Sequence, residues 1–116
     1  MARKTPKKIK VEMDVVGLKF RMKRDARADL ATRVKRMPMT VKLRREQENK
    51  YDINAIRVED SKGKHLGYIR RESAEVLAPR IDEQEIRVDS AELVGLYADQ
   101  DNANGQLKVT LLDYSE

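Results

Sequence analysis

The 116-residue sequence contains no cysteine, no tryptophan and a single histidine, His65. Without cysteine the chain can form neither a disulfide framework nor a thiolate metal site, and one histidine cannot supply an imidazole-rich site. No apolar run is long enough to span a bilayer, and the first residues, Met-Ala-Arg-Lys-Thr-Pro, lead into no apolar signal core. We therefore expect a cytoplasmic protein that binds no metal ion.

The sequence also lacks a catalytic constellation. Its serines have no histidine neighbour in a nucleophile motif, and no glycine-rich phosphate loop occurs. Asp99 and Asp101 could bind a hard cation, but the spacing of a calcium loop is absent around them, which favours a solvated loop. We expect a protein that is not an enzyme and that needs no cofactor.

Charge is distributed unevenly along the chain, although the net charge is only +5. Residues 1–45 hold 16 Lys and Arg against 4 acids, whereas residues 82–116 hold 2 basic residues against 9 acids. A basic half can form a surface that attracts phosphates by releasing their counterions, which favours nucleic acid as a partner. Two alternatives would also explain this charge distribution. The charged residues could form an ordinary solvated surface, or the basic and acidic halves could attract each other within one copy or between copies. Residues 1–8 are polar and basic, and we expect a flexible arm there.

Apolar periodicity predicts a strand and a helix in the first third of the chain. Apolar residues alternate from Ile9 and change phase at Gly17, which predicts one long strand to Met22 that is bent by a bulge. Apolar residues then recur every four positions between Asp25, a plausible N-cap, and Met37, which predicts a short helix. The basic side chains of this helix are interpreted as its solvated face, outside any site.

The rest of the chain reads mainly as short strands. Alternation predicts strands at 39–44, 56–58, 65–69, 86–97 and 107–112, joined by polar segments at 46–54, 61–64 and 99–105. The last of these segments contains an Asn-Gly turn signal. A second helix is predicted at 72–82, where Pro79 must distort or end it. The order β-α-β-β-β-α-β-β indicates one β-rich α+β domain, built as an antiparallel sheet or a small barrel.

Two motifs between Val41 and Asp82 occur at compatible spacing: N-K-Y-D-I-N-A-I in a polar segment, and G-Y-I-R-R-E-S-A-E-V-L-A-P at the start of the second predicted helix. They resemble the HIRAN family, whose pattern runs approximately L-x-R-E-x-x-N-x-Y-D-x-N-A-I-x-V and then G-Y-I-x-R-E-x-A-x-x-L-A-P. Upstream, Val15 to Phe20 looks like the opening strand of the family. The resemblance covers most of residues 13–82.

The resemblance implies a fold and a function. The fold would be a small OB-like, strongly bent antiparallel barrel with two short helices over residues 9–116, of the free-standing kind found in bacteria and phages. In the eukaryotic branch of the family this domain captures the 3′-hydroxyl end of single-stranded DNA. The resemblance therefore implies a module that binds nucleic acid, most plausibly single-stranded DNA at or near a 3′-hydroxyl end, without catalysis.

The resemblance also assigns roles to particular side chains. Tyr51 would stack on a terminal base, Asp52 would accept a hydrogen bond from the terminal hydroxyl, and Asn49 would shape or line the pocket. Lys19 and Phe20 would lie beside the pocket. The path of the DNA backbone would be flanked by Tyr68, Arg70 and Arg71.

The sequence departs from the family pattern at three positions. Lys50 stands where the family often has proline, so the loop is less rigid. Phe20 lacks the hydroxyl of the tyrosine found in DNA-binding members, which keeps a stacking surface but removes a polar contact. Tyr97 is the nearest candidate for an aromatic that DNA-binding members carry in a late loop.

Several candidates also have a purely structural interpretation. Asp52 and Asn54 could bond local backbone amides while Tyr51 packs against the barrel; we favour a binding role for Tyr51 and Asp52, and the turn role for Asn54. Phe20 lies in the apolar phase of its predicted strand, and alternation alone places it in the core.

The basic residues leave two further alternatives open. Arg70 and Arg71 precede the second helix, whose N-terminal amides can help to hold a phosphate, but a solvated arginine pair is an equal alternative. The whole basic face could instead bind an acidic protein partner or another copy of the chain. The sequence would then encode a protein-interaction adaptor or inhibitor.

Overall fold

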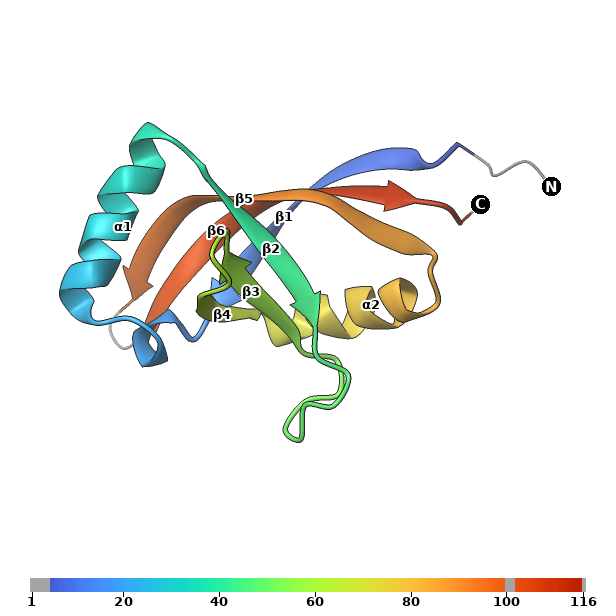
Figure 1. Ribbon diagram of the computed structural model, residues 1–116, viewed down its shortest axis with the longest axis horizontal. Helices are drawn as coiled ribbons and strands as arrows, with labels where there is room; N and C mark the ends of the chain where they lie inside the picture. Colours follow the sequence, from blue (N-terminus) through green and yellow to red (C-terminus); the bar gives the residue numbers. More distant parts are fainter. Residues whose placement is uncertain (1–4, 100–101, 116) are drawn as a thin grey trace.

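The computed structural model describes residues 5–99 and 102–115. Its strands form one closed barrel in the order β1-β4-β3-β2-β5-β6, with antiparallel pairing throughout (Figure 1). The elements are β1 (Lys7–Val16), the 3-10 turn η1 (Leu18–Phe20), α1 (Arg24–Arg36), β2 (Met39–Arg45), β3 (Ile56–Asp60), β4 (His65–Ile69), α2 (Arg71–Asp82), β5 (Ile86–Asp99) and β6 (Asn102–Asp113). The predicted β-rich α+β barrel with two helices is confirmed.

One face of each element supplies the core of the barrel. In β5 and β6, Leu93, Leu107 and Val109 are almost fully buried. Helix α1 packs Leu30 and Val34 against this core, because its apolar residues recur on one face. Helix α2 contributes its own buried face, Ala74, Leu77 and Ala78. Neither helix of the described chain is both long and apolar enough to cross a membrane.

The predicted strand from Ile9 to Met22 is wrong in its second half. Strand β1 ends at Val16, and Gly17 adopts a left-handed conformation with φ of 82°. This conformation favours glycine, and it turns the chain into η1 instead of bulging a continuous strand. The strand also begins earlier than predicted, because Lys7 and Lys8 pair with β6 although they were assigned to a flexible arm.

One other local prediction also differs from the structure. The Asn-Gly signal at 104–105 does not form a turn, because both residues belong to β6. Gly105 is buried there, and a Cβ at this position would lie 2.9 Å from Leu93 Cδ1, so glycine allows close packing. The second helix agrees with its predicted bounds, because α2 runs from Arg71 to Asp82, and Pro79 lies inside it without ending it.

The barrel closes through a short contact between β1 and β4. The described pairs are Val15 with Ile69 and Val16 with Tyr68. A Cβ on Gly67 would collide with the carbonyl oxygen of Val16, so glycine is required for this close approach. In contrast, β1 pairs with β6 along its whole length from Lys7 to Val15.

Candidate nucleic-acid interface

The eight candidate residues line two adjoining hollows that share Val16. The first hollow, of about 480 Å³, is lined by five of them: Asn49, Tyr51, Asp52, Tyr68 and Arg71. The second, of about 200 Å³, is lined by the other three: Lys19, Phe20 and Arg70. Residues from separate segments of the sequence are thus brought to one region around the junction of β1 and β4.

Asn49 organises the loop between β2 and β3. Its Oδ1 accepts hydrogen bonds from the backbone amides of Tyr51, at 2.9 Å, and Asp52, at 3.0 Å. Its Nδ2 donates to Glu46 Oε1 at 3.0 Å. One amide side chain thereby fixes the backbone directly after Lys50 and ties it to the Glu46 side chain, so Asn49 shapes the loop that forms one wall of the pocket.

Arg45 holds the same loop from the end of β2. Its guanidinium donates to the carbonyl oxygens of Ile53, at 2.6 Å, and Ala55, at 3.0 Å. It also forms a bidentate ion pair with Asp82 at the end of α2, with distances of 3.0 and 2.9 Å. The sequence interpretation did not identify this role, because Arg45 reads as an ordinary polar residue at the end of a strand.

The loop presents Tyr51 and Asp52 differently. The Tyr51 side chain is 96% exposed, so it does not pack against the barrel as the structural interpretation required. Asp52 is half-buried, and its Oδ1 accepts the backbone amide of Asn54 at 2.9 Å. A carboxylate has two oxygens and about four acceptor sites, so this bond leaves Asp52 with further acceptor capacity. Asn54 takes part in the turn through its backbone amide, whereas the role favoured for its side chain stays a prediction.

A polar network connects the loop to β4. Tyr68 Oη donates to Glu46 Oε1 at 2.9 Å, and Arg57 Nη1 lies 3.9 Å from Glu46 Oε2. Partial burial raises the pKa of Glu46, but the hydrogen bonds from Asn49 and Tyr68 and the charge of Arg57 outweigh it, so the pKa lies below its ordinary value. Glu46 therefore remains ionised at neutral pH and anchors both Asn49 and Tyr68.

His65 packs edge-on against Tyr68, with ring centroids 4.7 Å apart. Partial burial and the charges of Arg21 and Arg57 lower the pKa of His65. Its Nε2 lies 3.0 Å from the carbonyl oxygen of Gly67, so a neutral ring with its proton on Nε2 donates there.

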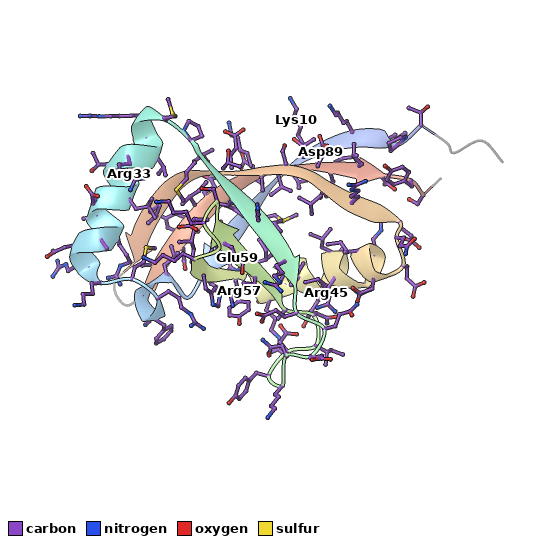
Figure 2. The ribbon with its side chains drawn as sticks, in the orientation of Figure 1. Lys10, Arg33, Arg45, Arg57, Glu59 and Asp89 are labelled. Atoms are coloured by element: carbon purple, nitrogen blue, oxygen red, sulfur yellow. The ribbon has the colours of Figure 1, made fainter. Side chains whose placement is uncertain are left out.

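Figure 2 shows Arg57 and Glu59 close together on the same strand, and Arg57 Nε lies 2.7 Å from Glu59 Oε2.

The second hollow contains Phe20 in an unexpected position. Alternation alone placed Phe20 in the core, but its side chain is 78% exposed. The reason is that Gly17 ends the strand, so the strand periodicity does not extend to η1. Lys19 Nζ lies 5.1 Å from the centre of the Phe20 ring, a cation–π arrangement.

The arginines near the start of α2 are exposed and ion-paired. Arg70 lies 3.2 Å from both Asp14 and Glu72, and Arg71 lies 3.5 Å from Glu75. Exposed pairs of this kind are worth little, so a phosphate can compete for the guanidinium groups at small cost.

Two cations of the first hollow were not among the candidates. Arg21 and Lys50 line it together with Arg71. Arg21 directly follows Phe20, and this Lys-Phe-Arg sequence was the available signal for it. With these residues, three cationic side chains surround the pocket that contains Asp52.

Tyr97 lies on β5, 46% exposed, instead of in a late loop. Its pKa is raised by partial burial and by the neighbouring carboxylate of Asp14. Asp14 also pairs with Arg70, which lines the second hollow, so Tyr97 lies at the border of that hollow.

Another hollow of the described chain is larger but contains none of the candidate residues. A larger hollow of about 690 Å³ lies between β2, β5 and the end of α2, but its lining contains no carboxylate and none of the eight candidates. Within residues 5–99 and 102–115, no group of three or more His, Cys, Asp or Glu residues is arranged to hold a metal ion.

Comparisons with known proteins support the resemblance on which the candidates were chosen. A sequence profile of the HIRAN domain family matches residues 9–111. No curated protein matches the sequence.

Three solved structures show the same fold. The crystal structure of the HIRAN domain of human HLTF is 23% identical, with a TM-score of 0.68, over 91% of this chain and 77% of that chain. The NMR structure of the HLTF HIRAN domain in its DNA-bound conformation is 21% identical, with a TM-score of 0.61, over 91% of this chain and 76% of that chain. A crystal structure of a protein from Lactobacillus plantarum is 25% identical, with a TM-score of 0.59, over 90% of this chain and 98% of that chain.

Proposed function

The chain belongs to the HIRAN domain family, and from this premise we propose that it binds single-stranded DNA at or near a 3′-hydroxyl end, without chemistry of its own. One solved relative of the same fold, the HLTF HIRAN domain, is described in a DNA-bound conformation. The observation that carries the proposal for this chain is the loop between β2 and β3. It is held by its own hydrogen bonds and exposes an aromatic ring next to a carboxylate and a cationic pocket.

Tyr51 supplies a surface for stacking. Its ring is 96% exposed, although the backbone behind it is fixed by Asn49. A base can stack on such a ring without sequence preference, because every base has a π-face. Because the loop is already ordered, binding costs little additional conformational entropy.

Asp52 supplies the preference for the end of the strand. Its carboxylate can accept a hydrogen bond from a terminal 3′-hydroxyl, and such a charge-assisted bond is stronger than a neutral one. A 3′-phosphate at the same place would bring two negative charges together and would be disfavoured. A strand without an end could not enter the pocket in this way.

The cations supply affinity for the backbone. Arg21, Lys50 and Arg71 line the pocket, and Arg70 and Lys19 line the adjoining hollow. Phosphates that follow the terminal nucleotide can therefore pass from one hollow to the other across Val16. These contacts position the strand and do not distinguish bases.

The test is fluorescence anisotropy with short 5′-labelled strands that end in a 3′-hydroxyl or a 3′-phosphate, and with an internally labelled circle of the same sequence. We expect the hydroxyl strand to bind most tightly. Equal affinity for the circle would show that the end is not recognised, and absence of binding to all three would rule out single-stranded DNA as the ligand. In that last case, a pull-down repeated after nuclease treatment would identify an acidic protein partner.

A further inference from the structure

Strand β1 has a free edge along most of its length. On one side it pairs with β6 from Lys7 to Val15, whereas on the other side the described pairs with β4 are confined to Val15 and Val16. In Figure 1 the first half of β1 runs toward the N-terminus at the end of the molecule opposite α1. A free edge of this kind exposes backbone donors and acceptors to a further strand.

The direction of the peptide groups shows which residues could pair there. The carbonyl of Asp14 accepts the amide of Arg70 at 2.9 Å, so it faces the β4 side. Because peptide groups alternate in direction along an antiparallel strand, those of Lys8, Lys10 and Glu12 face the same side, away from β6.

These three residues make the edge complementary to itself. An antiparallel copy centred on Val11 places Lys10 opposite Glu12 of the second copy, and Glu12 opposite its Lys10. Shifting the centre to Ile9 places Lys8 opposite Lys10. Shifting it to Lys10 places Lys10 opposite Lys10 while Lys8 faces Glu12, and shifting it to Glu12 places Glu12 opposite Glu12 while Lys10 faces Asp14. Opposite charges on directly facing residues stabilise a strand pair and like charges destabilise it. Of these four registers, only the one centred on Val11 brings no like charges face to face, so the charges favour it.

An apolar groove continues from this edge on the other face of β1. A hollow of about 390 Å³ is lined by Val11 and Met13 of β1 and by Val76 and Leu77 of α2. Val76 is 68% exposed, an unusual position for a valine on a helix with a buried face. In the register centred on Val11, the Ile9 side chain of a second strand lies beside Met13, on the side of this groove.

Figure 2 shows the opposite face of β1, where Lys10 points away from the barrel. Lys10 and Glu12 are both exposed in the single chain. Lysines on a free edge normally prevent pairing, but here Lys10 of each copy would meet Glu12 of the other.

We propose that the chain forms a symmetric dimer by antiparallel pairing of β1 with β1 of a second copy, in the register centred on Val11. The dimer contains one continuous sheet, β5-β6-β1 from each copy. A two-fold axis passes through the Val11 pair, so each contact occurs twice. This proposal does not rest on the nucleic-acid site, which lies at the other end of β1.

Charge reversal tests the register, with size-exclusion chromatography and light scattering over a range of concentrations after nuclease treatment. The wild-type protein is expected at twice its mass of 13.4 kDa. Lys10→Glu alone and Glu12→Lys alone each replace both attractive pairs by repulsive ones, and we expect dissociation constants at least about tenfold higher. A mixture of these two variants, and the double variant Lys10→Glu/Glu12→Lys, restore opposite charges and are expected to form dimers again.

The matched controls are Lys35→Glu and Asp29→Lys on α1, both exposed and at the opposite end of the molecule. Both are expected to dimerise like the wild type. Circular dichroism first establishes that every variant is folded. Amide hydrogen exchange gives a second readout, because the amides of Lys10 and Glu12 should be protected in the wild-type dimer and should exchange rapidly in the dissociated single variants. A wild-type monomer at all concentrations, or a dimer that tolerates both single reversals, would overturn the proposal.

Discussion

Asn49→Ala tests whether a preformed loop is what allows Tyr51 and Asp52 to bind. The substitution removes three hydrogen bonds: those from the backbone amides of Tyr51 and Asp52, and the one to Glu46. At about 0.5 to 1.5 kcal/mol each, these bonds contribute roughly 1.5 to 4.5 kcal/mol to the ordered loop. Water replaces some of them in an exposed loop, so we expect a loss of about 1.5 to 2 kcal/mol.

If that loss leaves the loop mostly open in the free protein, part of the binding free energy is spent on ordering the loop, and the affinity falls. Because 1.4 kcal/mol corresponds to a factor of ten, affinity for a 3′-hydroxyl strand should fall by roughly 10- to 30-fold. Anisotropy measures this change, and hydrogen exchange at the amides of Tyr51 and Asp52 should accelerate in the same variant.

Asn54→Ala is the matched control in the same loop. The hydrogen bond of Asn54 to Asp52 comes from its backbone amide, which alanine keeps. We expect its affinity to stay near the wild-type value, after thermal unfolding has shown that both variants are folded. Wild-type affinity in Asn49→Ala together with faster amide exchange would refute the argument, because an open loop would then bind as well as an ordered one.

Three further predictions concern the rest of the site. Tyr51→Ala should cost about 1 to 3 kcal/mol on any single strand with a free end, measured by anisotropy, and an equal loss on a circle would contradict stacking at the terminus. Arg70→Ala with Arg71→Ala should weaken binding to different base sequences about equally; a changed base preference in competition assays would mean that these arginines contact bases. The pKa of His65 should rise when DNA binds, because phosphates offset the charge of Arg21 that helps to lower it. An NMR titration of this single histidine measures the shift, and an unchanged or lower pKa would argue against phosphate contact at Arg21.

The candidate loop could be predicted because its interactions are local. Asn49 bonds amides two and three residues further on, and Asp52 bonds an amide two residues further on, so a short motif encodes this part of the turn. The barrel followed from alternation in most strands, since the periodicity of a half-buried strand is visible in the sequence.

The errors occurred where distant contacts decide the local structure. A change of phase in the apolar alternation at a glycine looks the same whether the strand bulges there or ends there in a left-handed residue. At Gly17 the strand ends. The Asn-Gly pair at 104–105 was read as a turn, but Gly105 serves a close contact with Leu93 on the neighbouring strand. Arg45 was missed because Asp82, its partner, is 37 residues away.

We propose that Asp52 distinguishes a terminal hydroxyl from a terminal phosphate. Asp52→Asn keeps an Oδ1 that can accept the amide of Asn54, so the turn is preserved while the charge is removed. The decisive measurement is the ratio of affinities for 3′-hydroxyl and 3′-phosphate strands in the wild type and in this variant. We expect a clear hydroxyl preference in the wild type that shrinks in Asp52→Asn. An unchanged ratio in the folded variant would contradict it and leave Asp52 as a turn residue.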